Sequence, residues 1–319
     1  MSLASYVVKR VLVAVGLVFL VATLNFVIMH LTPGGPATVL LTNPRITSQE
    51  RQQILVAYGL DKPLYVQYVL YIVGMFTGNW GLSYFYLEPA YVVIQQRIGN
   101  TLLLMVPSLI LTIVIGILLG IVSARRPFST LDRFASSGAF FFYAMPAFWL
   151  GFVLLTIFAL DLRVLPAGGM SSIAGAGTIT DLLTHLVLPV ITLVLVNLAN
   201  FSLLIRTSLI DVLDQNYIMT ARGKGLSEKS ILYRHALRNA LLPVVTMTGL
   251  FVGFILTGAI LTESVFSWPG LGLLTFQSIL NRDYPVILSL FFIFSVMIIA
   301  SNLVTDIIYG FLDPRVSYG

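Results

Sequence analysis

Cysteine is absent from the 319 residues of this chain, which excludes disulfides, iron–sulfur clusters and thiolate metal sites. Charge is scarce as well. Asp, Glu, Lys and Arg make up 10% of the residues, whereas soluble domains carry about a quarter. His30, His185 and His235 are the only histidines and lie far apart in the sequence, so a metal centre is not expected. The basic residues form no continuous stripe of the kind that binds nucleic acid.

Long hydrophobic runs take the place of the missing charge. Hydrophobic residues make up 58% of the chain, and the mean hydropathy is +0.95. A membrane-spanning helix needs about 20 mostly apolar residues. The runs that can span are 11–29, 100–123, 134–160, 185–205, 241–261 and 286–310. The sequence therefore predicts an all-α integral membrane fold with six transmembrane helices. No small-residue cleavage site follows the first run, so we interpret it as a retained anchor.

The region between the first two spans has a different composition. Residues 31–98 contain Pro, Gly, Thr and several charges, yet apolar residues recur, which favours an ordered external segment. Within it, the run at 64–77 ("LYVQYVLYIVGMFT") is short for a span and rich in tyrosine, so an interfacial helix is expected, with an embedded helix as the alternative. We predict an N-terminal part (1–95), a five-span domain (96–312) and a tail (313–319).

The distribution of Lys and Arg predicts the topology. With the N-terminus inside, twelve of the 18 basic residues fall in the inside segments 1–10, 124–133, 206–240 and 311–319. The outside segments hold the other six, although they are longer in total. Inside loops are enriched in basic residues. Both termini are therefore predicted to be cytoplasmic, with the longest basic loop at 206–240.

That loop contains "TARGKGLSEKSILYRHALRNALLP" at 220–243, the densest charge in the chain. Asp214 is a candidate cap for a first helix, and Gly225 suits the left-handed position that closes it. Ser227 is a candidate cap for a second helix, with Glu228 in its first turn, where the helix dipole favours an acid. The second helix should continue past Pro243 into the fifth span with a kink. The pattern indicates a compact helix–glycine–helix structure.

Simpler interpretations of this loop are available. Basic loops retain topology without binding a partner, but retention does not account for the helix–glycine–helix pattern. A lipid-binding basic patch is the second alternative, although Glu228 and the intervening apolar residues dilute it. The "GKG" at 223–225 lacks the spacing of a phosphate-binding P-loop, so no nucleotide site is expected here.

Five stretches, in order along the chain, resemble one protein family. They are "YGLDKPLYVQY", "AMPAFWLG", "QNYIMTARGKGLSEKSILYRHALRNALLPV", "ESVFSWPGLG" and "DIIYGFLDPRV". All are similar to permease subunits of binding-protein-dependent ABC importers, in the dipeptide/oligopeptide/nickel branch, and to the first permease of the pair. The basic loop resembles the family's E-A-A-x-x-x-G coupling loop, of which only Ala221 and Gly225 match.

The resemblance implies a type I permease fold and a function. The chain would form half of a translocation path for peptides, with oligosaccharides or nickel as alternative cargo. Its partners would be a second homologous permease, two ATP-binding subunits and an external solute-binding protein, in a prokaryotic plasma membrane. ATP and Mg would bind the ATP-binding subunits, so this chain would carry no cofactor and no enzymatic activity.

Two sets of residues are singled out as candidate sites. The resemblance implies that the loop contacts an ATP-binding subunit, with Ala221 as a small contact point. The coupling residues are Tyr217, Ala221, Arg222, Gly225, Leu226, Glu228 and Lys229. Polar side chains within spans are costly and usually face protein or water, and Gly253 shares a stripe at helical spacing with Thr246 and Thr257. The candidate path residues on this basis are Ser108, Thr112, Asn200, Thr246, Gly253, Thr257, Ser295 and Asn302.

Helix packing is the alternative explanation for part of the second set. Glycines four apart, at 116 and 120 and at 249 and 253, let helices touch. Asp306 is a candidate proton carrier, or more simply the partner of a loop arginine. The external segment and the "FSWPGLG" turn at 266–272 are both expected to lie outside and to contact the binding protein or cap the path.

Two other classes of membrane protein fit less well. A secondary transporter usually has ionisable groups near the midplane and an internal repeat, and neither is visible in this sequence. An intramembrane enzyme would show paired acids, an H-E-x-x-H motif or a Ser/His arrangement within its spans, which this chain lacks.

Reporter fusions test the predicted topology. A reporter fused after Gly319 should signal from the cytoplasm, and one fused after Leu160 should signal from outside, because three spans separate residue 160 from the cytoplasmic N-terminus. An external signal from the Gly319 fusion would overturn the assignment of both termini to the cytoplasm.

Overall fold

The computed structural model describes residues 3–32, 59, 61–172 and 177–312, together with 47, 49, 52 and 56. The predicted tail at 313–319 and much of the predicted external segment lie outside this range. Every long element in the described residues is a helix, and the β-structure among them is an isolated bridge between Leu82 and Pro89. This architecture confirms the all-α prediction.

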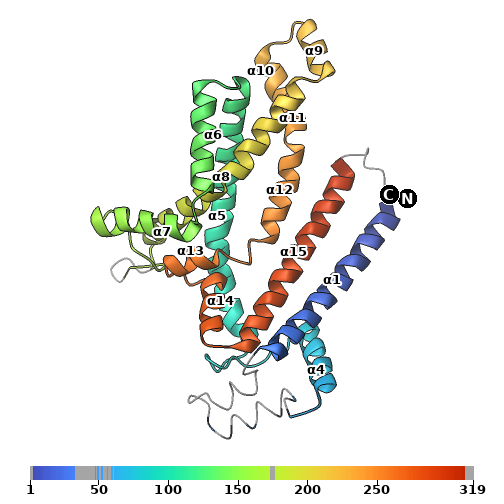
Figure 1. Cartoon of the computed structure of the whole chain (residues 1–319), viewed down its shortest axis with the longest axis vertical. Helices are drawn as coiled ribbons and strands as arrows, with labels where there is room; N and C mark the ends of the chain where they lie inside the picture. The colour runs from blue at the N-terminus through green and yellow to red at the C-terminus, as the bar shows by residue number, and fades with distance from the viewer. Residues whose placement is uncertain are drawn as a thin grey trace. The chain divides into compact units, whose positions relative to one another are not determined.

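Four helices are long and apolar enough to cross a membrane. They are α1 (Leu3–Leu31), α5 (Ala90–Arg125), α8 (Ile179–Leu213) and α15 (Tyr284–Leu312). Two further candidates are helix pairs with a sharp bend, so the described residues supply up to six spans. These six occur in the predicted order along the chain, as the colours of Figure 1 show. The membrane fold is thereby confirmed, although two spans are not simple helices.

The predicted third span, 134–160, is broken. It consists of α6 (Thr130–Tyr143), α7 (Ala147–Leu155) and the π-helical turn η1 (Thr156–Asp161), with a bend of 98° between α6 and the α7–η1 segment. Pro146 precedes α7 with ψ of 130°, outside the helical region. A proline also pushes the residue before it away from helical angles. The prediction of one continuous helix was therefore wrong at Pro146.

The predicted fifth span also ends early. α12 (Leu242–Gly253) stops at Gly253 rather than at residue 261. Gly258 then adopts φ of +64°, which no α-helix accommodates, and α13 (Ile260–Val265) follows as a separate short helix. The helix therefore ends at Gly253 and a turn follows at 254–257, although the sequence remains apolar; the conformation of Gly258 separates this turn from α13.

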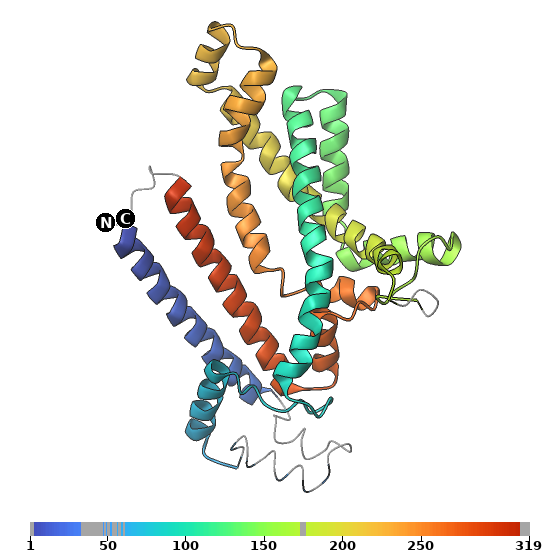
Figure 2. The same ribbon diagram turned by 180° about the vertical axis from the view of Figure 1, so that it is seen from behind.

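The described chain divides into two compact units. Unit 1 comprises Met1–Leu102, Gly253–Ser264 and Pro269–Gly319. In it α1 and α15 run side by side, as Figures 1 and 2 both show, with α4 (Leu64–Thr77) packed against α1. Arg10 of α1 forms an ion pair with Asp306 of α15 at 2.6 Å. The prediction that Asp306 pairs with an arginine is therefore confirmed, but the arginine belongs to the first helix and not to a loop.

Unit 2 comprises Leu103–Val252 and Val265–Trp268. Its core is built where α5 meets α8: an added Cβ at Gly116 would lie 2.6 Å from the Phe201 Cβ, and one at Gly120 would lie 2.6 Å from the Ile205 Cγ2. Phe201 and Ile205 are fully buried. The glycine pair at 116 and 120 thus serves helix packing, as its spacing indicated.

A bidentate ion pair joins α6 to α8 in the same unit. Arg206 donates from Nε to Asp132 Oδ1 at 2.7 Å and from Nη2 to Oδ2 at 2.8 Å. Asp132 is buried, and it also accepts from the Phe128 amide at 2.7 Å. A buried carboxylate needs such partners, because an unpaired one would cost several kcal/mol. The pair therefore sets how α6 lies against α8.

The close approach of α5 and α8 predicts a difference between two glycines. Gly120→Ala should destabilise the fold by about 1–3 kcal/mol. The added Cβ would also lie 2.7 Å from the Ser202 carbonyl oxygen, and a backbone atom of a packed helix cannot move aside as the end of a side chain can. Gly138→Ala in α6 is the matched control. It has no atom within 4 Å and should be neutral or stabilising by up to about 1 kcal/mol. Thermal unfolding in detergent measures both, and equal unfolding temperatures would contradict the packing assignment.

Candidate functional site

The basic loop folds into a short helix, a glycine turn and a second helix. The first is α9 (Asn216–Gly223), and Figure 1 shows it with α10 (Glu228–Ser230) close to α11 (Leu237–Ala240). Gln215, not Asp214, precedes α9 as its N-cap. Asp214 instead ends α8, where its amide donates to the Ile210 carbonyl. The predicted cap was therefore wrong by one residue, because α8 extends further than its apolar run.

The glycine turn has the predicted conformation. Gly225 adopts φ of +79°, and its amide donates to the Arg222 carbonyl at 2.9 Å. The Leu226 amide donates to the Ala221 carbonyl at 3.3 Å, which closes the end of α9. Ser227 caps α10 by accepting from the Ser230 amide at 3.4 Å. These bonds confirm both the left-handed glycine and the serine cap.

One face of α9 is buried against the apolar core of unit 2 and is not exposed to a partner. Ile218 is fully buried and Ala221 is 9% exposed. They belong to one apolar cluster with Leu209 of α8 and with Ile231 and Leu232 of the following helix. Ala221 was expected to contact a partner. The structure instead uses its small size to let α9 lie close to the chain's own core.

The outer face of the loop carries exposed apolar side chains among the charges. Tyr217 is 43% exposed, Met219 56% and Leu226 41%. Arg222 and Glu228 form a surface ion pair, with Nε and Oε1 at 3.0 Å. These exposed apolar side chains lie among charged residues of the loop. We call the surface formed by Tyr217, Met219 and Leu226 the outer face of the loop.

The second helix leads directly into a span. It runs through α10, the π-helical turn η2 (Ile231–Ala236) and α11, and then bends by 46° into α12. The bend lies next to Pro243, which has no amide hydrogen to donate. The predicted kink is confirmed, whereas the π-helical turn was not predicted. The Asn239 side chain also donates to the Tyr217 hydroxyl at 2.8 Å, so α9 is tied to this helix on its outer side.

The candidate path residues are divided between the two units. Ser108, Thr112, Asn200 and Thr246 lie in unit 2, whereas Gly253, Thr257, Ser295 and Asn302 lie in unit 1. Several of the hydroxyls bond within their own helices: Ser108 donates to the Leu104 carbonyl and Thr112 to the Ser108 carbonyl, both at 2.7 Å. Both side chains are buried. Such bonds satisfy a hydroxyl in an apolar setting without a ligand.

The remaining members of that set differ in exposure. Ser295 donates to the Phe291 carbonyl at 2.7 Å, and Thr257 donates to the Phe254 carbonyl at 2.7 Å. An added Cβ at Gly253 would lie 3.1 Å from the Ser301 Cβ of α15, so this glycine serves packing within unit 1. Asn200 and Thr246 are half-buried, and Asn302 is exposed.

Sequence reasoning missed a buried carboxylate in unit 1. Glu263 of α13 is completely buried, and its Oε2 accepts from the Leu273 amide at 3.0 Å. Its Oε1 accepts from the Thr101 hydroxyl at 3.1 Å, and that hydroxyl accepts from the Leu271 amide at 2.7 Å. Glu263 thus caps the N-terminus of α14 (Leu271–Leu280), where the helix dipole favours a negative group. The signal in the sequence that could have identified this site was the single acid, Glu263, directly after a long apolar run.

The glycines around Glu263 explain part of the "FSWPGLG" sequence. An added Cβ at Gly270 would lie 2.5 Å from Glu263 Oε2, and one at Gly272 would lie 3.0 Å from the same oxygen. Trp268 is completely buried and Phe266 is 2% exposed. Trp268 and Phe266 are therefore not exposed for contact with an external partner, and whether the turn contacts the binding protein or caps the path stays a prediction. Its aromatic residues are packed inside, and its glycines make room for a carboxylate.

A second buried acid organises the start of α15. Asp283 accepts from the Ser83 hydroxyl and from the Tyr84 amide, the latter at 3.0 Å. Burial raises the pKa of the Asp283 carboxyl, and the bonds from Ser83 and Tyr84 offset part of that rise. The tight turn at 83–87 is thereby attached to the α14–α15 connection within unit 1.

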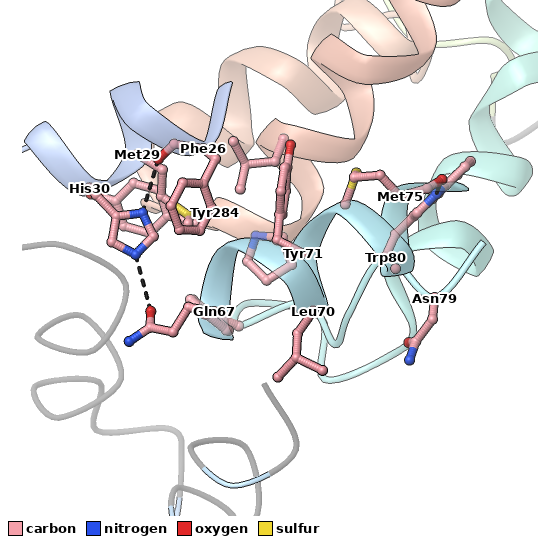
Figure 3. A pocket seen from close by; sticks show the side chains of 14 residues that line it. Phe26, Met29, His30, Gln67, Leu70, Tyr71, Met75, Asn79, Trp80 and Tyr284 are labelled. Atoms are coloured by element: carbon pink, nitrogen blue, oxygen red, sulfur yellow. Dashed lines mark hydrogen bonds between the residues drawn. The ribbon is translucent and has the colours of Figure 1, made fainter. Parts of the chain in front are cut away.

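A cavity of about 140 Å³ lies near these residues, between α1, α4 and the start of α15 (Figure 3). Its walls are mostly apolar and aromatic. His30 projects toward it and bonds to the Gln67 Oε1 at 3.1 Å, while its other ring nitrogen bonds to the Phe26 carbonyl at 2.9 Å. The Gln67 amide donates to the Lys62 carbonyl at 2.8 Å, which orients the side chain. These bonds hold α4 against α1.

Comparisons with known protein families match nearly the whole chain. The family model "binding-protein-dependent transport system inner membrane component" matches residues 116–318, and the model of the N-terminal part of such membrane components matches residues 3–105.

Curated relatives match over the full length. The chain is 38% identical over 317 residues to the oligopeptide transport system permease protein AppB of Bacillus subtilis (strain 168), covering 99% of this chain and 100% of that protein. It is 39% identical to a putative peptide permease protein of Brucella suis biovar 1, covering 98% of each. It is 38% identical to the glutathione transport system permease protein GsiC of Escherichia coli (strain K12), covering 98% of this chain and 99% of that protein.

A solved structure supports the fold. The chain superposes with a TM-score of 0.57 on a subunit of an inward-facing MetNI methionine ABC transporter, covering 71% of this chain and 99% of the other. At 16% sequence identity, this likeness concerns the fold alone.

The Glu263 site predicts a dependence of stability on pH. Burial is the largest effect on this carboxyl and raises its pKa from 4.5 to about 7, although the bonds from Leu273 and Thr101 oppose it. Because the pKa is raised on folding, the stabilising contribution is complete below about 4.5 and is lost as the pH rises through about 7. Glu263→Gln cannot titrate. Between pH 4.5 and about pH 7, the unfolding temperature of the wild type should therefore fall relative to that of Glu263→Gln. If the two unfolding temperatures changed with pH in parallel, the raised pKa of Glu263 would be contradicted.

Proposed function

Because the chain belongs to the family of inner membrane components of binding-protein-dependent transport systems, we propose that it carries peptides across the membrane as one permease subunit of an ATP-driven importer. The observation that carries the proposal is identity of 38–39% over essentially the whole chain with permeases for peptides. All three relatives are named for oligopeptide, peptide or glutathione transport, which favours peptides over oligosaccharides or nickel.

The proposed assembly contains the other parts of an ABC importer. A second homologous permease completes the path, and an external solute-binding protein delivers the peptide. Two ATP-binding subunits hold ATP and Mg²⁺, so this chain acts as a permease and not as an enzyme. The bilayer is the remaining partner, and no nucleic acid is involved. We place the chain in a prokaryotic plasma membrane.

We propose that both termini face the cytoplasm. The ion pair between Arg10 and Asp306, at 2.6 Å, supports a common side for the start of α1 and the end of α15. Twelve of the 18 basic residues fall on the side assigned to the cytoplasm, in agreement with the enrichment of basic residues in inside loops. The loop at 206–240 then faces the ATP-binding subunits.

The loop is proposed to act as a lever. Its outer face contacts an ATP-binding subunit, while Ala221 and Gly225 hold its shape from within. Ile218 and Ala221 pack against the second helix, the Arg222–Glu228 ion pair spans the turn, and Asn239 bonds to Tyr217. A displacement of α9 therefore moves α10 with it. Since α10 continues through η2 and α11 to α12, the movement reaches the fifth span.

The polar residues singled out within the spans remain the proposed path. Those with exposed or half-buried side chains, such as Asn200, Thr246 and Asn302, are the better candidates for contact with a peptide. Ser108 and Thr112 bond to carbonyls of their own helix, yet each hydroxyl oxygen keeps its capacity to accept a bond from a ligand. The proposed organisation is an N-terminal part (1–95), a five-span domain (96–312) and a tail (313–319).

Two substitutions of Gly225 test the lever. Gly225→Pro should abolish peptide-stimulated ATP hydrolysis and uptake, because proline cannot adopt φ of +79° and has no amide to donate to Arg222. Gly225→Ala is the matched control. An added Cβ there has no atom within 4 Å, so the only cost is about 1–2 kcal/mol of backbone strain, and coupling should largely survive.

A third variant separates contact from shape. Leu226→Asp changes a side chain that is 41% exposed and lies outside the buried core, so the loop should fold normally yet lose stimulation by peptide. ATPase activity and peptide uptake are measured in reconstituted transporter, with membrane insertion checked in parallel. Normal coupling in both Gly225→Pro and Leu226→Asp would refute the lever.

A further inference from the structure

A basic pocket lies between the end of α5 and the loop, within unit 2. It has a volume of about 390 Å³. Its walls come from α5, α8, α9, α10 and η2, and it is lined by Arg125, Arg126, Leu213, Arg222, Glu228, Lys229, Leu232 and Tyr233. The fold thus gathers cations from segments that are about a hundred residues apart in the sequence.

The pocket has an excess of positive charge. Four cationic side chains line it and one carboxylate opposes them. That carboxylate, Glu228, is already paired with Arg222 at 3.0 Å. Among the residues that the structure describes, no ion pair engages Arg125, Arg126 or Lys229. From the sequence alone, Glu228 counted against a lipid-binding basic patch. Because Glu228 is paired with Arg222, it leaves the positive charge of the other three cations in the pocket uncompensated.

The chemistry of the lining fits a phosphate group. Guanidinium groups match phosphate oxygens through paired N–H donors, and a lysine adds a compact positive charge. The Tyr233 side chain is 50% exposed and adds a hydroxyl at the rim. Leu213 and Leu232 form an apolar part of the wall. A ligand with a phosphate and an attached apolar or uncharged portion suits this combination better than a bare ion does.

The place of the pocket indicates where the phosphate comes from. Arg125 is the last residue of α5, a helix long and apolar enough to span the membrane. Leu118, Val122 and Arg125 follow one another at spacings of four and three residues, so they lie on one face of this helix. Leu118 is 58% exposed and Val122 is 43% exposed. An apolar stripe therefore runs along the span and ends at the basic pocket.

We propose that this pocket binds the phosphate headgroup of an anionic phospholipid, whose acyl chains lie along Leu118 and Val122 of α5. The same pocket is lined by Arg222, Glu228 and Lys229 of the loop, so a bound headgroup contacts the loop as well as the end of α5. The site does not depend on the identity of the transported peptide.

Lipid retention by the intact transporter tests the proposal. The complex is reconstituted in bilayers of phosphatidylcholine with phosphatidylglycerol and then extracted, and the phosphatidylglycerol that stays bound is counted by native mass spectrometry. Arg125→Gln and Arg126→Gln should each lower retention about five-fold, since one basic residue near an anionic surface contributes about 1 kcal/mol. Arg133→Gln is the matched control: it removes an exposed arginine of α6 outside the pocket and should leave retention unchanged.

Two further measurements distinguish other occupants. In pure phosphatidylcholine bilayers, saturable binding of inorganic phosphate that both pocket variants abolish would show a free-phosphate site and overturn the lipid assignment. Loss of ATP-binding subunits from either pocket variant, with phosphatidylglycerol retention unchanged, would show a protein docking surface and would also overturn the lipid assignment.

Equal retention of phosphatidylglycerol in all three arginine variants would refute the pocket as a lipid site. Unfolding temperatures confirm that the variants are folded, and Lys229→Gln repeats the test from a different element.

Discussion

The close approach of α5 to α8 is the contact on which most of unit 2 depends. Because Gly116 and Gly120 have no side chains, α8 can place Phe201 and Ile205 directly against α5. The apolar cluster that begins there continues through Leu209 to Ile218 and Ile231 of the basic loop. The loop is therefore packed as an extension of the membrane core and is not a flexible connection between spans. The proposed lever requires rigid attachment of this kind.

Buried carboxylates perform a second structural task in this chain. Asp132, Glu263 and Asp283 are all nearly inaccessible, and each accepts bonds from backbone amides or side chains of other segments. In a protein with so few charges, each buried acid joins elements that apolar contacts alone would leave free to slide. Non-directional apolar packing and directional polar bonds therefore complement each other: the first provides most of the burial, and the second sets which groups face one another.

The loop and the basic pocket give one segment two surfaces with different chemistry. Tyr217 and Leu226 are exposed apolar groups among charges, which suits contact with a protein. Arg125, Arg126 and Lys229 line a separate cavity, which suits a phosphate. In the proposed assembly the loop lies between an ATP-binding subunit and the headgroups of the bilayer. This position would account for its unusual charge density.

The sequence by itself determined the membrane class, the order of the spans, the family and the helix–glycine–helix pattern with Gly225 left-handed. Hydrophobic length, charge distribution and local backbone preference are properties of neighbouring residues, so they can be read along the chain. Only the tertiary structure decided that Ala221 and Trp268 face inward and that Glu263 caps α14. It alone brought Arg125 and Arg126 to Lys229. Those outcomes depend on which distant segments meet, and no local pattern records that choice.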